Sequence, residues 1–117
     1  MTHSYRDLKV WQKAMDVVRL AYPVAASLPQ NEQFALASQM RRSAVSIPSN
    51  IAEGQKRLGS VELARFCGIA LGSVAELETQ AMIAEEQYGI DVEQLMLALE
   101  EVSKMLTVMI RRLRKPR

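Results

Sequence analysis

Cysteine and histidine are almost absent from this chain of 117 residues, which contains one of each, Cys67 and His3. One cysteine cannot form an internal disulfide, and a zinc site needs several cysteine or histidine ligands. A single histidine near the N-terminus also excludes the Glu-x-x-His pairs of di-iron bundles and leaves no Ser–His–Asp triad in the body of the chain. We therefore expect no metal, no cofactor and no catalytic residue, and we predict that the protein is not an enzyme.

Membrane-length apolar runs and phosphate-binding glycine loops are missing as well. The purely apolar runs are only a few residues long, and the first nine residues, MTHSYRDLK, lack the apolar core of a signal peptide. The glycine-containing stretch AEGQKRLGS does not have the spacing of a P-loop. Together with the lone cysteine, these absences favour a cytoplasmic protein that does not insert into membranes.

What is present is the pattern of an ordinary folded domain. Apolar residues make up 49% of the chain and charged residues 24%, and the length suffices for one core but not for two. Apolar residues recur every three or four positions in four segments, which predicts helices at about residues 8–27, 32–57, 61–88 and 92–114. Because the connections are short, we expect residues 1–117 to form one all-α domain, an antiparallel up-down-up-down four-helix bundle.

A proline lies within the pattern of the second helix. Pro48 cannot donate a hydrogen bond to the carbonyl of Ala44 and its ring crowds that carbonyl, so a kink is predicted. The helix could instead end at Ile47, but the following segment is too short to form a helix of its own. We therefore predict one long, proline-kinked second helix. Pro23 predicts a kink or an early end in the first helix by the same reasoning.

A ridge of polar side chains accompanies the apolar stripe of the second helix and continues on the third. This polar ridge comprises Arg41, Arg42, Ser46, Asn50, Glu53 and Glu76. Its hydroxyl and amide groups either cap the carbonyl that the kink frees or contact a ligand. Arg41 lies within the apolar spacing and needs an acidic partner, for which Glu76 is the candidate, with Arg42 as the alternative donor.

The first and fourth helices carry more apolar surface than one core needs. The expected inner stripe of the first helix comprises Leu8, Trp11, Met15, Val18, Tyr22 and Ala25, and a second apolar side comprises Val10, Val17, Leu20 and Val24. In the fourth helix, thirteen of the twenty-two residues from 92 to 113 are apolar. Because a lone subunit rarely exposes a large apolar patch, we predict a homo-oligomer that assembles through these two helices.

The excess positive charge is concentrated in a basic C-terminal tail. Residues 111–117, RRLRKPR, hold five of the fifteen basic residues and no acidic one, and the rest of the chain has a net charge of −3. The tail either contacts phosphates or complements the negative end of the last helix. The candidate phosphate contacts are Arg111, Arg112, Arg114, Lys115 and Arg117, with Lys56, Arg57 and Arg65 as a second patch.

Three stretches carry a family resemblance: Tyr5 to Trp11, Ser38 to Gly54 with its SIPSNIAEG block, and Ala70 to Gln80. They resemble the bacterial four-helix-bundle proteins named after intervening sequences in large-subunit ribosomal RNA genes. The resemblance implies a cytosolic bundle without enzymatic activity that assembles into a ring of five subunits. A related branch, the accessory variability determinant proteins of retroelements, binds nucleic acid and a reverse transcriptase. The family name reflects genomic location, so a ribosomal function does not follow from it.

Two functions therefore remain open. The chain is either an oligomeric scaffold that binds the backbone of RNA or DNA, or a protein-interaction module with a partner such as a polymerase and no nucleic-acid role. Basic residues favour the first, although aromatic residues do not interleave with them for base stacking. The seven methionines favour an adaptable apolar surface and hence the second.

Overall fold

The computed structural model describes residues 4–116, and within them every regular element is helical. The four α-helices are α1 (Lys9–Ala26), α2 (Leu36–Lys56), α3 (Ser60–Tyr88) and α4 (Glu93–Arg114). Two short 3-10 turns, η1 (Tyr5–Asp7) and η2 (Gln30–Glu32), precede α1 and α2. The prediction of an all-α fold with four helices is confirmed, and the arrangement is compatible with a four-helix bundle.

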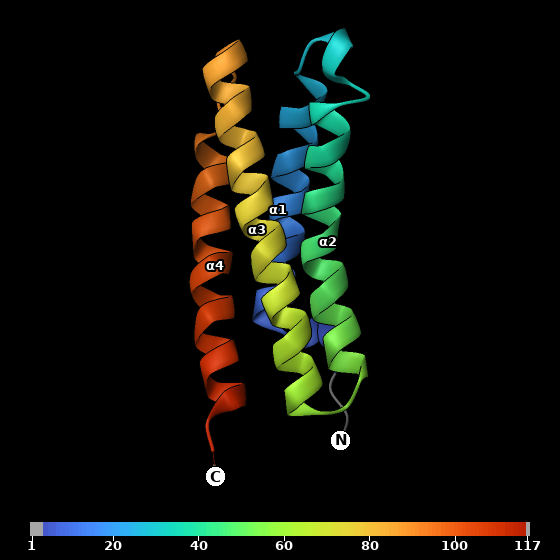
Figure 1. Ribbon diagram of the computed structural model, residues 1–117, viewed down its shortest axis with the longest axis vertical. Helices are drawn as coiled ribbons and strands as arrows, with labels where there is room; N and C mark the ends of the chain where they lie inside the picture. Colours follow the sequence, from blue (N-terminus) through green and yellow to red (C-terminus); the bar gives the residue numbers. More distant parts are fainter. Residues whose placement is uncertain (1–3, 117) are drawn as a thin grey trace.

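The helices form an elongated particle of 50 × 20 × 19 Å. Helix α1 packs against α2 and α4, and α3 packs against the same two helices. Both chain ends and the α2–α3 connection lie at the lower end of Figure 1, whereas the α1–α2 and α3–α4 connections lie at the upper end. The up-down-up-down course of the chain and the kink at Pro48 stay predictions.

Each helix buries a row of apolar side chains spaced three or four residues apart, which is the pattern expected of one helical face. In α1 this row is Val10, Ala14, Val17, Ala21 and Ala25. In α4 it is Leu95, Leu99, Val102 and Leu106.

The buried face of α1 therefore differs from the stripe expected from the sequence. Trp11, Met15 and Val18 are only half-buried, and Tyr22 is exposed. The expected stripe contains the largest apolar side chains of the helix. The observed buried face instead includes Ala14 and Ala21, which have no exposed surface. Small alanines let the helices approach closely, so the large side chains lie at the edge of the contact rather than at its centre.

The observed helix starts also differ from the expected ranges. Helix α1 begins at Lys9 after Leu8, which forms no side-chain cap, and the preceding Asp7 lies in η1. Helix α2 begins at Leu36 rather than near residue 32, because the chain first forms η2 and then leaves helical geometry at Ala35, with φ −120° and ψ −101°.

Helix α2 continues through Pro48 to Lys56, so the helix does not end at Ile47. Its last turns lie very close to α3. A Cβ atom added to the buried Gly54 would lie 2.7 Å from Cβ of Phe66, which is closer than real Cβ contacts. Gly54, the last residue of the SIPSNIAEG block, therefore sets the close approach of α2 and α3 next to the turn that joins them.

Candidate nucleic-acid interface

The cations at the end of α4 are exposed and have no local counter-charge. Arg111, Arg112 and Arg114 belong to the last turns of α4, and Lys115 follows as its C-cap. None of these four side chains forms an ion pair within residues 4–116. Arg117, the fifth cation expected here, lies outside the described residues, as does His3. Four cations therefore remain available for an external anion, although they also lie at the negative end of the α4 dipole.

The second expected patch surrounds the turn between α2 and α3, and two of its three cations have acidic partners. Arg57 lies 3.8 Å from a carboxylate oxygen of Glu53, and Nε of Arg65 donates to Glu62 at 2.9 Å. This hydrogen bond lowers the pKa of Glu62 and raises the pKa of Arg65. Lys56 is exposed and forms no ion pair with any described residue. The patch therefore carries less net charge than its cations alone suggest.

The phenyl ring of Phe66 supports both guanidinium groups of this patch. Arg57 and Arg65 lie over the ring, with Cζ 5.3 Å and 4.6 Å from its centroid. Phe66 itself is buried against the bundle. A cation over an aromatic face is held in place while its outer edge stays in water. Helical spacing alone identifies Phe66 only as an apolar position of α3, so the sequence does not indicate this arrangement.

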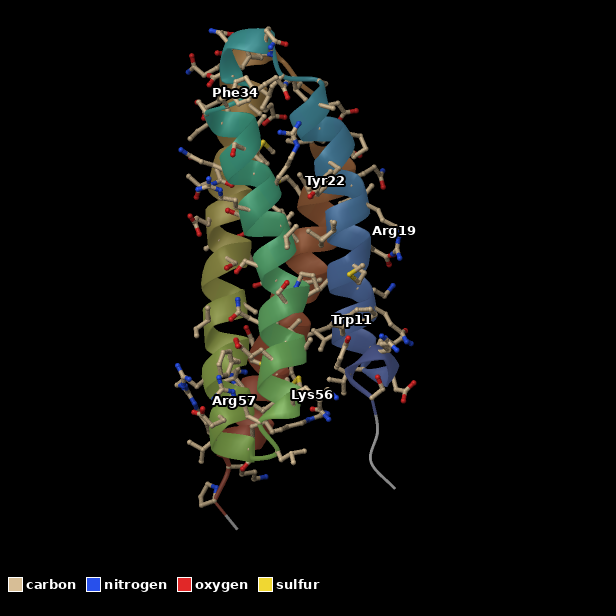
Figure 2. The ribbon with its side chains drawn as sticks, turned by 90° about the vertical axis from the view of Figure 1, so that its right-hand side faces the viewer. Trp11, Arg19, Tyr22, Phe34, Lys56 and Arg57 are labelled. Carbon is tan, nitrogen blue, oxygen red and sulfur yellow. The ribbon has the colours of Figure 1, made fainter. Side chains whose placement is uncertain are left out.

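Both patches lie at the same end of the bundle: the α2–α3 turn and the end of α4 are at the bottom of Figure 1, and Figure 2 labels Lys56 and Arg57 near the bottom. A cross-section at the level of the Ser46–Ser73 contact and just above the Lys13–Glu101 ion pair divides the molecule into two ends. The basic end, residues 4–16, 47–72 and 101–116, has eleven basic and five acidic residues. The acidic end, residues 17–46 and 73–100, has three basic and eight acidic residues. Charge is thus separated along the long axis.

The polar ridge forms a local network between α2 and α3. Oγ of Ser46 lies 2.8 Å from Oγ of Ser73, and the Asn50 amide donates to the hydroxyl and the carbonyl of Ser46 at 2.9 Å and 2.8 Å. The carbonyl that Asn50 binds is that of Ser46, not the Ala44 carbonyl opposite Pro48. Glu53 pairs with Arg57 instead of joining this network. The network ties α2 to α3 at the mid-height of the bundle.

The arginines of the ridge do not pair with Glu76, which is exposed. Arg41 donates instead to Oε1 of Gln33 at 2.9 Å, and the amide of Gln33 donates to the carbonyls of Ala25 and Leu28. A neutral side chain thus holds the half-buried guanidinium. Sequence spacing could not identify Gln33, because it lies in the connection before α2. Arg42 is exposed and borders an open hollow between α1 and α2.

A mainly apolar groove of about 580 Å³ runs between α1 and α4 at the basic end. Its walls are Leu8, Val10, Met105, Val108, Met109 and Leu113, and its rim carries Lys9, Lys104 and Arg112. This groove lies on the two helices for which the sequence predicted surplus apolar surface.

Cys67 is a core residue. Its side chain is fully buried, with Sγ 4.0 Å from Sδ of Met109, and burial raises the pKa of the thiol to about 11. The thiolate needed for a nucleophile is therefore disfavoured. Within residues 4–116 no three His, Cys, Asp or Glu side chains gather as a set that could hold a metal ion. In the same range, no helix is both long enough and apolar enough to cross a membrane.

Comparison with known proteins gives one family. A family model described as 23S rRNA-intervening sequence protein matches residues 6–108. The match spans α1 to α3 and most of α4 and stops before the cations of residues 111–117. No curated protein matches the chain.

Proposed function

The chain belongs to the 23S rRNA-intervening sequence protein family, and from that premise we propose that it is a non-enzymatic, homo-oligomeric scaffold whose basic end binds the phosphate backbone of RNA or DNA. We place this function in the cytoplasm, where a lone reduced cysteine is ordinary. The proposal includes an antiparallel up-down-up-down bundle and a bend of α2 at Pro48.

The observation that carries the proposal is the separation of charge along the molecule. Cations from η1, α1, the α2–α3 turn, α3 and α4 meet at one end, where seven of the eleven have no ion-pair partner among the described residues. A polyanion would be attracted to this end and repelled by the other. Such contacts neutralise phosphates without reading bases, so binding should be sequence-independent and steeply dependent on salt.

Assembly would make these weak contacts effective. Several exposed large apolar side chains, among them Leu97 and Val108 of α4, are available for burial between subunits. The ring of five subunits that the family resemblance implies is the assembly we propose. Several basic ends held together would bind one nucleic acid with far higher avidity than a single subunit.

The test compares cations at the two ends of the bundle. Fluorescence anisotropy with duplex and single-stranded RNA and DNA is measured from low to physiological salt for the wild type and for two double variants. Arg111→Gln/Arg114→Gln removes two charges from the basic end, and Arg19→Gln/Arg42→Gln removes two from the acidic end. Each lost phosphate contact lowers the slope of log affinity against log salt by about 0.9. We expect a weaker, less salt-dependent interaction only for the first variant.

Two results would contradict the proposal. One is no binding of any nucleic acid at low salt. The other is an equal effect of both double variants, since that would mean that total charge matters and its position does not.

The groove between α1 and α4 supports a second candidate function, a protein-interaction module. Its apolar walls and cationic rim fit a helix that has an apolar face flanked by acidic residues. This alternative predicts that nucleic-acid binding is absent while Met105→Asp in the groove abolishes binding of a partner such as a polymerase. Binding of nucleic acid by the wild type favours the proposed function instead.

A further inference from the structure

Two aliphatic side chains project into solvent at the tip of the basic end. Leu58, in the turn between α2 and α3, is 83% exposed, and Val61, in the first turn of α3, is 79% exposed. Nothing in the bundle packs against most of their surface, so the core does not explain why these positions are apolar. Singly exposed apolar residues are common, but two within one short tip next to cations are more specific.

The backbone of the tip adds a second, independent observation. Leu58 has φ +59°, in the left-handed region that glycine adopts at little cost and that costs other residues roughly 1–2 kcal/mol. Gly59, the next residue, has φ −154°, which any residue can adopt. The chain thus places leucine where glycine would be favoured and glycine where none is needed. Strain of this kind is typical of contact sites.

Cations surround this apolar tip. Lys56 and Arg57 precede it, and Arg65 follows one turn into α3. The guanidinium groups of Arg57 and Arg65 are held over Phe66, so they cannot fold across Leu58 without losing these contacts. The tip therefore presents a narrow aliphatic protrusion between positioned positive charges.

The chemistry of the tip favours duplex DNA among the nucleic acids. Binding of single strands relies on exposed aromatic rings that stack on bases. At the basic end, Phe66 is buried, and the ring of Tyr5 packs edge-on against that of Trp11 with the centroids 5.3 Å apart. Aliphatic side chains act instead as wedges between base pairs in the minor groove of DNA, flanked by Arg or Lys. That groove is about 6 Å wide in B-form DNA, whereas the minor groove of duplex RNA is wide and shallow.

We propose that Leu58, supported by Val61, is a wedge that enters the minor groove of B-form DNA and partly unstacks a base step, while Lys56, Arg57 and Arg65 contact the phosphates on either side. This inference rests on the proposed function and extends it: phosphate contacts supply attraction, and the wedge supplies a preference for deformable duplex DNA. Flexible pyrimidine–purine steps would be favoured without any base-specific hydrogen bond.

The test uses the full chain and a short DNA duplex that carries, at a central step, an adenine analogue whose fluorescence rises when it is unstacked. Leu58→Gly removes the wedge and at the same time relieves the backbone strain, so this variant folds at least as well as the wild type. Phe34→Ser is the matched control, because Phe34 is 91% exposed at the acidic end (Figure 2). The same-sequence RNA duplex and vesicles with anionic lipids are measured in parallel.

We expect the wild type and Phe34→Ser to raise the fluorescence of the DNA probe and Leu58→Gly not to raise it. The affinity of Leu58→Gly for the DNA duplex should fall about tenfold, a loss of about 1.4 kcal/mol, with an unchanged salt slope. Binding of DNA without a fluorescence rise, or with equal affinity for Leu58→Gly, overturns the wedge and leaves the proposed function standing. Equal effects on the RNA duplex, or a Leu58-dependent binding to vesicles alone, also overturn it. No binding of nucleic acid at any salt overturns both.

Discussion

At the scale of single residues, two glycines of similar helical context have opposite expected roles. Gly54 has no space for a side chain, because a Cβ would lie 2.7 Å from Cβ of Phe66. Gly68 in α3 has no atom within 4 Å of the same position. Gly54→Ala should therefore lower the free energy of unfolding by about 1–3 kcal/mol through overpacking. Gly68→Ala should raise it by about 0.5–1 kcal/mol through helix propensity. Urea denaturation of both variants measures these free energies. An unchanged free energy of unfolding for Gly54→Ala would contradict the close approach of α2 and α3.

The buried thiol of Cys67 predicts a pH dependence of the free energy of unfolding. Its ordinary thiol pKa of 9.0 rises to about 11 in the fold, because burial disfavours the thiolate. Well below pH 9 the thiol is protonated in both states and contributes no pH dependence. Between pH 9 and 11 the unfolded chain loses this proton first, so the folded state loses stability as pH rises.

The measurement is the free energy of unfolding of wild type and Cys67→Ala across this pH range. The variant should be less stable by about 1–2 kcal/mol near neutral pH because of the lost volume. This difference should shrink as pH rises from 9 to 11, since other titrating groups affect both chains equally. If the free energies of unfolding of the two proteins run parallel across this pH range, the thiol has the same pKa in the folded and unfolded states.

Single-residue features were the least predictable from the sequence. Met40, Ala44, Ile47 and Ile51 recur every three or four positions, a spacing that predicts one buried helical face, and all four are fully buried. Periodicity could not choose between the two apolar sides of α1, because that choice depends on how closely neighbouring helices approach.

At the scale of elements, the connection between α1 and α2 depends on Gln33. Its amide donates to the carbonyls of Ala25 and Leu28, and its oxygen accepts from Arg41, so one side chain joins the end of α1 to α2. Gln33→Ala should lower stability by about 1–3 kcal/mol, because two carbonyls and a half-buried guanidinium lose their partner.

Gln33→Glu is the sharper variant, since its carboxylate still accepts from Arg41 but cannot donate to the carbonyls. We expect it to be destabilised as well. Gln30→Ala, an exposed position in η2 without a side-chain hydrogen bond, is the control and should match the wild type. Thermal unfolding compares the three variants, and a wild-type melting temperature for Gln33→Ala would contradict this role.

The elements themselves were largely predictable, and their ends were not. Apolar spacing places a helix through Pro48 because the segment beyond it is too short to be helical alone. The start of α2 at Leu36 depends on η2 and on the bonds of Gln33, which join residues five to eight positions apart in the chain. Helical spacing does not register such contacts.

At the scale of the whole molecule, the separation of charge could not be predicted from the order of residues. The sequence shows a basic tail at residues 111–117, and residues 1–110 have a net charge of −3. Only the fold brings the start of α1, the α2–α3 turn and the end of α4 together at one end of the molecule (Figure 1). A net charge of +2 therefore hides two ends of opposite sign.

The central claim is that the working unit is an assembly that brings several basic ends together. Its interface should include the apolar groove between α1 and α4, because surplus apolar surface and a rim of cations meet there. Val108→Glu places a charge in this groove. Met82→Glu makes the same kind of change on α3, where Met82 is 44% exposed and Val108 is 43% exposed.

Light scattering coupled to size-exclusion chromatography tests this claim most directly. A ring of five 13.1 kDa chains has a mass of about 65 kDa, and we expect this mass for the wild type and for Met82→Glu at micromolar concentration. Val108→Glu should dissociate toward single chains. A wild-type particle of 13.1 kDa would contradict the account.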